Sequence, residues 1–341
     1  MIILTDSAFR ENLFPFTHTR HAADIRIGIL TIREKWELLS RQKISTDEKE
    51  AGIRIPANII PTKENFEYII AAAKSNAAIE GSEIIKIIER PWHIFQFNDM
   101  ALRNDFEIIT AGKRSAPLSH SNKTISPENI FIEEGTSVEH SMINASAGPV
   151  YIGKDAEIME GCMIRGPVSI GEGSKLKMGT KIYGATTIGP YCVAGGEIKN
   201  SVFFGHSNKA HDGYLGDSVL GEWCNLGAGT SNSNVKNTGG EVSYTQHAKK
   251  EAVYAGNKGG LLMGDYSRAA INTSFNTGSV VGVSCNIFGE RMPAKFTENF
   301  TWGNERYIFD KAIKDINNWK KMKGQAVTHE EINMLKKLYG L

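Results

Sequence analysis

The stretch NKAHDGYLG, Asn208 to Gly216, places a histidine where a proton could be moved at neutral pH. Histidine has the side-chain pKa nearest to 7, so His211 is a candidate general base. Lysines before and after it in the chain could neutralise a substrate phosphate. The Gly-Ala-Gly corner of NLGAGT, at 225–230, could supply amides to a developing oxyanion. This set suits acyl transfer to an amine, because an ammonium group must lose a proton before it can attack.

Each of these residues also has a simpler explanation. His211 could be a loop histidine that bonds a backbone carbonyl, and His206, five residues earlier, is a competing base. Asn225 and Asn234 could be turn asparagines that bond their own backbone. Three lysines could be solvated surface charges: Lys177, Lys199 and Lys236.

An aliphatic residue recurs at every sixth position in the middle of the chain. The positions are Ile152, Ile158, Ile164, Ile170, Leu176, Ile182 and Ile188, with Ala194 next. A longer period of 18 lies over this one, because GPVYIG at 148–153 returns as GPVSIG at 166–171. A triangular coil of three short strands has this period, with one aliphatic side chain inward per strand and glycine at the corners. The pattern predicts a hexapeptide-repeat, left-handed parallel β-helix over residues 130–304.

The six-residue rhythm lapses twice, at 196–215 and at 231–260, in segments rich in Asn, Gly, Lys and His. We expect both segments to be loops that leave the coils, since loops on a rigid scaffold often carry function. The first loop would hold His211 over a groove, with Lys199 and Asn225 on the stacked coils beneath.

The flanking segments have other patterns. Residues 1–110 contain apolar runs that suit an α/β domain, and 111–129 is a Ser-, Pro- and Asn-containing linker. Residues 305–341 have helical spacing, and a capping box, THEE, opens the last helix. We expect these C-terminal helices to be packing elements.

Composition narrows the function classes. The chain has 39 Lys and Arg against 38 Asp and Glu. It therefore lacks the excess of basic residues that is typical of proteins that bind nucleic acid or an anionic membrane. We find no signal peptide and no long apolar run, and we expect a cytoplasmic protein. The four cysteines are far apart and are interpreted as small buried thiols: Cys162, Cys192, Cys224 and Cys285.

The motif KAHDGYLGDSVLGEWCNLGAGTSNSN resembles the acetyltransferase half of the bifunctional GlmU family, which pairs glucosamine-1-phosphate acetyltransferase with N-acetylglucosamine-1-phosphate uridyltransferase. The stretches FTHTRHAADIRIGILTIREKW and PWHIFQFND resemble the alternative bacterial version, with its divergent sugar-nucleotidyltransferase N-terminus. The likeness covers most of residues 1–305. It implies a shortened nucleotidyltransferase-like α/β domain, a β-helix and C-terminal helices.

The resemblance implies roles for individual residues of the β-helix. His211 matches the catalytic base, and Ala228 matches a residue whose backbone N–H meets the acetyl thioester. The matched substrate-binding residues are Lys199, Tyr214, Asn225, Asn234, Lys177 and Lys236. Lys177 replaces a family arginine, so it keeps the charge but loses the bidentate fork.

The resemblance in the N-terminal segment comes with departures. Arg20, Asp24 and Arg26 match a triphosphate-binding opening, and Asn98 matches an Mg²⁺ ligand. However, His21 stands where the family has proline, and no aspartate that would share the metal is found. About 110 residues precede the linker, whereas the family's domain has about 200. Mg²⁺ chemistry on a triphosphate needs clustered carboxylates, so a domain kept for folding or assembly is the favoured interpretation.

The resemblance therefore implies an acetyl-CoA-dependent enzyme that N-acetylates an amino-sugar phosphate and works as a homotrimer, with Mg²⁺ required only for an active N-terminal domain. The acceptor would be glucosamine 1-phosphate. Three alternatives stay open: nucleotidyl transfer by the N-terminal domain, acetylation of a nucleotide-linked amino sugar, and a non-catalytic scaffold. A scaffold has no need for the set of His211, Tyr214, Asn225 and Asn234.

Overall fold

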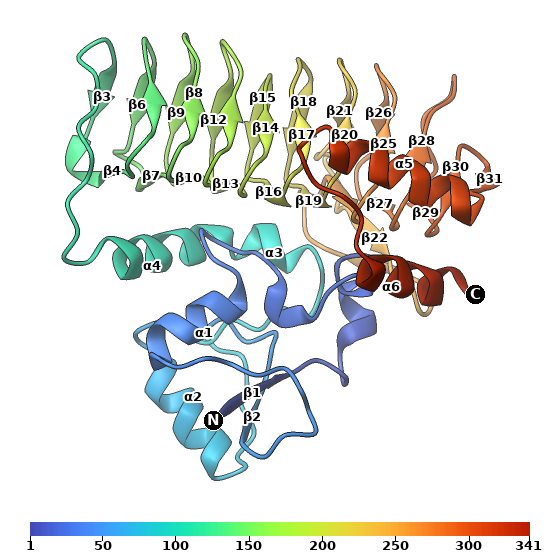
Figure 1. The fold of residues 1–341 in the computed structure, drawn as a ribbon, viewed down its shortest axis with the longest axis horizontal. Helices are drawn as coiled ribbons and strands as arrows, with labels where there is room; N and C mark the ends of the chain where they lie inside the picture. The colour runs from blue at the N-terminus through green and yellow to red at the C-terminus, as the bar shows by residue number, and fades with distance from the viewer.

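The computed structural model describes residues 1–341, and most of the chain forms a three-sided solenoid of parallel strands (Figure 1). Each full coil contributes one short strand to each side. The predicted left-handed, hexapeptide-repeat β-helix is therefore confirmed, with about 10 turns.

The three sides of the solenoid are three parallel sheets. The nine-stranded sheet contains β4 (Ile130–Ile132), β7 (Val150–Ile152), β10 (Val168–Ile170), β13 (Thr186–Ile188), β16 (Val202–Gly205), β19 (Val219–Glu222), β24 (Leu261–Met263), β27 (Ser279–Val281) and β29 (Phe296–Thr297). The ten-stranded sheet contains β5 (Ser137–Val138), β8 (Glu157–Ile158), β11 (Lys175–Leu176), β14 (Val193–Ala194), β17 (Asn208–Lys209), β20 (Asn225–Leu226), β25 (Arg268–Ala269), β28 (Asn286–Ile287), β30 (Thr301–Trp302) and the antiparallel β31 (Glu305–Arg306). The six-stranded sheet contains β3 (Lys123–Ile125), β6 (Met142–Asn144), β9 (Met163–Arg165), β12 (Lys181–Tyr183), β15 (Glu197–Lys199) and β18 (Tyr214–Gly216), and the pair β21 (Ser231–Asn232) and β26 (Ser274–Phe275) follows on the same side.

Aliphatic columns fill the solenoid. Ile152, Ile170 and Ile188 pair in register on successive coils and are fully buried. At one corner, serine and cysteine contribute to a hydrogen-bonded ladder, in which the Ser207 hydroxyl accepts from the Cys224 N–H at 2.9 Å. All four cysteines are buried and unpaired, as predicted.

The first lapse in the six-residue rhythm is not an outward loop, so this prediction was wrong. Strands β15, β16, β17 and β18 continue the three sheets through residues 196–215. The coils are shortened instead, because Ile188 pairs with Phe203 and Phe203 with Leu220. Both steps are shorter along the chain than the earlier step from Ile170 to Ile188. The corners of these coils contain fewer residues, which interrupts the six-residue period while the three sheets stay continuous.

The second lapse is a true excursion, as predicted. Between β21 and β24 the chain leaves the coil and forms an antiparallel hairpin of β22 (Ser243–Thr245) and β23 (Ala252–Tyr254). Tyr244 at its centre stacks on Trp92 of the N-terminal region, with ring centroids 5.0 Å apart. The excursion therefore packs against the N-terminal region.

The N-terminal region packs on the nine-stranded sheet (Figure 1). It has a parallel pair, β1 (Ile2–Thr5) and β2 (Ile53–Pro56), helices α1 (Ile32–Ser40), α2 (Phe66–Lys74), α3 (His93–Gln96) and α4 (Asn98–Thr110), and 3-10 turns η1 (Arg10–Leu13), η2 (Phe16–His18) and η3 (Ala22–Asp24). Its apolar core includes outward side chains of the solenoid, among them Phe204 and Val219. The first solenoid strand, β3, and the turn η4 (Pro127–Asn129) fall inside the predicted linker.

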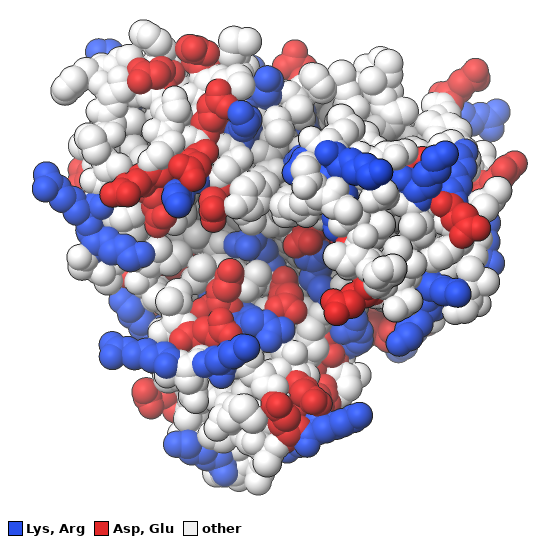
Figure 2. Space-filling view, in the orientation of Figure 1, with Lys and Arg blue, Asp and Glu red and all other residues white.

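Two C-terminal helices, α5 (Phe309–Lys321) and α6 (His329–Tyr339), pack beside the last coils. The predicted capping box is present, because the Thr328 side chain accepts from the Glu331 N–H and Glu331 bonds back to the Thr328 N–H. None of the helices has the length and apolar character needed to cross a bilayer. On the face drawn in Figure 2, basic and acidic side chains are intermixed, in line with the net charge of +1.

Candidate functional site

His211 lies at the corner between the ten-stranded and six-stranded sheets, in the turn that joins β17 to β18, and it is exposed. The preceding coil passes this corner at Gly195 and Gly196. The following coil passes it at Ala228 and Gly229, where the Gly229 N–H donates to the Asp212 carbonyl at 2.9 Å. His211 and Ala228 are therefore brought to stacked corners of neighbouring coils.

The backbone around Ala228 leaves one donor free. The N–H groups of Gly227, Gly229 and Thr230 each bond a carbonyl, at 2.9 to 3.1 Å. The Ala228 N–H has no such acceptor in the chain, although its carbonyl accepts from the Asn272 N–H at 2.7 Å. An unpaired amide at a tight corner is the kind of group that can bind a carbonyl oxygen of a ligand.

Polar side chains gather along the six-stranded side, from Tyr214 at the start of β18 to the corner that follows β15 and β18; we call Lys199, Asn200, Tyr214, Asp217 and Asn234 the Tyr214 cluster. The Asn234 amide donates to the Tyr214 hydroxyl at 3.1 Å and also to the Asp217 carboxylate. Asp217 is 3% exposed and accepts a second bond from the Asn200 amide at 2.6 Å. Burial and the Asp217 charge raise the pKa of Tyr214 to about 12, so its hydroxyl stays protonated at neutral pH.

Lys199 follows Tyr183 on the next strand of the six-stranded sheet. Its ammonium lies 5.5 Å from the centroid of the Tyr183 ring, and no ion pair in the chain engages it. The Tyr183 hydroxyl donates to Glu197 at 2.6 Å. Lys199 thus offers a charge to an anionic ligand on the same face as Tyr214.

Not all predicted residues join this group. Asn225 lies on the ten-stranded sheet, where its side-chain oxygen faces the Asn208 amide at 3.5 Å. Lys177 lies between β11 and β12, at the same corner of the solenoid as His211 but two coils earlier. Lys236 lies in the excursion near Lys295, whose pKa is lowered by burial and by the Lys236 charge.

Sequence reasoning missed Asn200 and Asp217, the residues that hold Asn234 in place. Asp217 is the acidic residue of the YLGD motif, and that position was the available signal. Lys209, two residues before His211, was also missed. The six-residue period that marks inward positions is interrupted there, so the sequence did not indicate that the Lys209 side chain points inward.

The competing base, His206, lies at a different corner, between the nine-stranded and ten-stranded sheets. Its ring stacks on Trp223 with centroids 4.4 Å apart and on Tyr191 at 5.2 Å. Burial and the charges of Lys323 and Lys320 lower the pKa of His206 to about 4. A group with so low a pKa is a weak base at pH 7, and its packing is structural.

The residues predicted to bind a nucleotide lie where the N-terminal region docks on the solenoid. Arg20 pairs with Asp265 and with Glu222, 3.2 Å away; although burial opposes it, these carboxylates raise the pKa of Arg20 above its usual value. The Arg26 Nε donates to the Phe204 carbonyl at 3.0 Å. Asp24 pairs with Arg33 at 2.6 Å.

Asn98, the predicted Mg²⁺ ligand, is fully buried. Its side-chain oxygen accepts from the Gly28 N–H at 2.7 Å, and its amide donates to the Ala185 carbonyl at 2.7 Å. In this arrangement the Asn98 amide group joins the two parts of the chain and is not presented to a metal ion.

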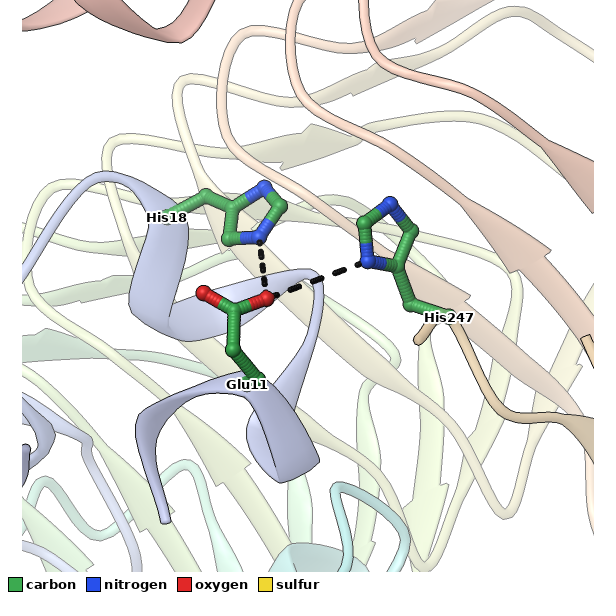
Figure 3. Close-up of side chains that lie close together, drawn as sticks. All are labelled: Glu11, His18 and His247. Carbon is green, nitrogen blue, oxygen red and sulfur yellow. Dashed lines mark ion pairs between the residues drawn. The ribbon is translucent and has the colours of Figure 1, made fainter. Parts of the chain in front are cut away.

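One group with metal-ligand character joins the N-terminal region to the excursion (Figure 3). Glu11 Oε2 lies 3.6 Å from His18 Nε2 and 3.9 Å from His247 Nδ1. The Asn299 amide nitrogen lies 2.9 Å from His18 Nδ1, and the Asn299 oxygen accepts from the Val283 N–H. This bonding assigns the His18 proton to Nε2, toward Glu11, so the nitrogen facing the group is a donor and not a ligand.

A second such group contains Asp6, His21 and Glu48. His21 Nδ1 accepts from the Ala23 N–H at 3.1 Å, which assigns the proton of that ring to Nε2, 3.4 Å from Asp6. Glu48 is engaged by the Asp6 and Ser7 N–H groups. The same reasoning makes the His21 nitrogen that faces this group a donor and not a metal ligand.

Comparisons with known proteins agree with the motifs. A family model described as sugar nucleotidyl transferase matches residues 2–50. The chain is 31% identical over 117 residues to the bifunctional protein GlmU of Methanocaldococcus jannaschii, covering 34% of this chain and 28% of that protein. It is 27% identical over 254 residues to GlmU of Methanococcus vannielii, covering 67% and 52%.

A bifunctional sugar-1-phosphate nucleotidylyltransferase/acetyltransferase of Sulfurisphaera tokodaii is 33% identical over 93 residues, covering 27% of this chain and 23% of that protein. A solved hexapeptide transferase family protein from Anaplasma phagocytophilum aligns with 64% of this chain and 87% of its own, at 15% identity and a TM-score of 0.17. The chain thus spans about half or less of the length of these curated relatives. The resemblance to GlmU-type transferases predicted from the motifs is confirmed by these curated relatives and by the family model that matches its first residues.

Proposed function

We propose that this chain transfers the acetyl group of acetyl-CoA to the amine of an amino-sugar phosphate, with glucosamine 1-phosphate as the acceptor. The observation that carries the proposal is the stacking of the exposed His211 corner on the Ala228 corner, next to the Tyr214 cluster. A base, a free amide and a lysine then border one stretch of surface. The Sulfurisphaera relative is a bifunctional sugar-1-phosphate nucleotidylyltransferase/acetyltransferase, which supports this reaction class.

In this mechanism His211 removes a proton from the substrate ammonium group. The freed amine attacks the thioester carbonyl carbon, and the Ala228 N–H donates to the oxygen as it becomes negative. The carbon–sulfur bond then breaks, the imidazolium returns its proton to the CoA sulfur, and the nitrogen of the new amide releases its extra proton to water. Lys199 holds the phosphate of the acceptor, while Tyr214 and Asn234 bond its hydroxyl groups.

We also propose that the chain acts as a homotrimer with the site between subunits. The nine-stranded sheet is covered by the N-terminal region, whereas the six-stranded sheet leaves Met142 and Met163 61% and 47% exposed in adjacent register positions. Exposed apolar side chains on neighbouring strands favour an interface. Asn225, Lys177 and Lys236, which lie apart from the Tyr214 cluster within one chain, could then act on a neighbour's site.

A thiol-release assay tests the proposal. Purified protein with acetyl-CoA and glucosamine 1-phosphate should release free CoA, and His211→Ala should slow release by about 100-fold or more, the range for loss of a general base. His140→Asn is the matched control, because His140 is exposed at a distant coil and its positive φ of 51° suits asparagine. An unchanged rate in His211→Ala, or no release with any amino-sugar phosphate, contradicts the proposal. Release only with a nucleotide-linked amino sugar would assign the alternative acceptor.

The N-terminal region supports a second candidate, nucleotidyl transfer, through the family match over residues 2–50. Pyrophosphate release from UTP, N-acetylglucosamine 1-phosphate and Mg²⁺ tests it. We expect little or none, because Arg20, Arg26 and Asn98 are engaged with the solenoid. Release at a rate comparable with acetyl transfer would overturn this expectation.

A further inference from the structure

A lysine occupies an inward position of the β-helix directly below His211. Lys209 on β17 pairs with Ala194 on β14, in the column that continues to Leu176 and Ile158. The other members of this column are buried and apolar, and Lys209 itself is only 2% exposed. An ammonium group in such a column is unfavourable unless the surrounding groups bond it.

Two backbone carbonyls bond the buried ammonium. Lys209 Nζ donates to the Gly195 carbonyl at 3.0 Å and to the His211 carbonyl. No carboxylate forms an ion pair with it; burial lowers its pKa to about 8, and the more distant charge of Asp212 opposes that shift. The side chain therefore links the corner of one coil to the corner of the next from inside the solenoid.

The glycines of the lower coil allow this close arrangement. A side chain at Gly196 would place its Cβ 2.9 Å from Lys209 Nζ and 2.8 Å from the His211 carbonyl oxygen. A Cβ at Gly195 would lie 2.4 Å from the Ala210 carbonyl oxygen. Real Cβ atoms do not approach so closely, so the His211 turn rests directly on bare backbone.

We propose that Lys209 is a positioning residue that fixes the backbone of the His211 corner from the interior, and so sets where the imidazole stands over the site. It does not touch the substrate and acts only through His211. The inference deepens the proposed acetyl transfer and rests on it for the kinetic consequence. The coil from Ala194 to Lys209 has fewer residues than the preceding one, from Leu176 to Ala194. The corner therefore has few residues that could rearrange if the Lys209 hydrogen bonds were lost.

Lys209→Met tests the inference, because methionine fills the apolar column without donating hydrogen bonds. Leu176→Met, in the same column two coils away, is the matched control. We expect Lys209→Met to lower kcat for CoA release at least 10-fold with KM changed less than twofold, and Leu176→Met to leave kcat unchanged. In a His211→Ala background, Lys209→Met should cause no further loss, since a positioning residue has nothing left to position.

Amide hydrogen exchange supplies a readout that does not depend on turnover. The Glu197 and Gly229 N–H groups donate to the Gly213 and Asp212 carbonyls of this corner, at 3.2 and 2.9 Å. Peptides that contain these two amides should exchange at least 10-fold faster in Lys209→Met than in the parent protein, while those of the first coils stay unchanged. Unchanged exchange at this corner, or an equal loss of kcat with and without His211, would overturn the inference. If the parent protein releases no CoA, the proposed function fails, and the exchange rates still decide whether Lys209 fixes the corner.

Discussion

The Arg20 guanidinium lies against the Asp265 carboxylate, 245 residues away in the chain, where the N-terminal region meets the solenoid. Arg20 also pairs with Glu222, and the Thr19 hydroxyl donates to Asp265 at 2.6 Å. Both members of the Arg20 and Asp265 pair are buried, with side chains 9% and 3% exposed. The arginine that resembles a phosphate-binding group therefore holds the two parts of this chain together.

Arg20→Met should destabilise the protein by about 3–5 kcal/mol, because it leaves Asp265 buried without its partner. Urea unfolding followed by circular dichroism measures the change. The double variant Arg20→Met/Asp265→Asn should recover part of the loss, since the unpaired charge is gone. A loss below about 1 kcal/mol in the single variant would show that the pair does not secure the docking.

The period of six predicted the solenoid because every sixth side chain must point inward whatever the rest of the sequence is. The same pattern could not distinguish a shortened coil from an outward loop, since both remove the period. At 196–215 the coil is shortened, and the inward position is taken by Lys209, a residue type that no apolar pattern detects. The docking role of Arg20 was equally hidden, because the sequence does not show that Asp265 lies next to it.

Tyr244 provides a test of how the excursion docks. Tyr244→Ala should destabilise the protein by about 3–5 kcal/mol, because it removes a fully buried ring stacked on Trp92. Tyr244→Phe should change the free energy of unfolding by less than about 1 kcal/mol, because the buried hydroxyl has no hydrogen-bond partner to lose. Chemical unfolding of both variants gives the two values. A large loss in the phenylalanine variant would mean that the hydroxyl is bonded in solution.

His206 should make stability depend on pH. Its folded pKa, about 4, lies below the ordinary value of 6.5, so between these values the unfolded chain binds a proton that the folded chain does not. The His206 contribution is therefore fully present above pH 6.5 and is lost as pH falls toward 4. Melting temperatures of the parent protein should fall across this window.

The variant His206→Phe keeps a ring between Tyr191 and Trp223 and removes the titration. Its melting temperature should fall less steeply from pH 6.5 to 4 than that of the parent protein. The comparison concerns slopes, because phenylalanine at the positive φ of 54° changes absolute stability as well. Parallel slopes for the two proteins would mean that His206 does not titrate in this range.

The proposed trimer rests on the exposed apolar side chains of the six-stranded sheet. Met142→Glu should shift the protein from trimer to monomer in light scattering after size exclusion, because a buried glutamate at an interface lacks a partner charge. Met322→Glu is the control: Met322 is 76% exposed just after α5, away from that sheet, and its variant should stay trimeric. A parent protein that runs as a monomer at micromolar concentration contradicts the trimer. If Met142→Glu is monomeric and folded but still releases CoA at the parent rate, the site is complete within one chain and does not need a neighbour.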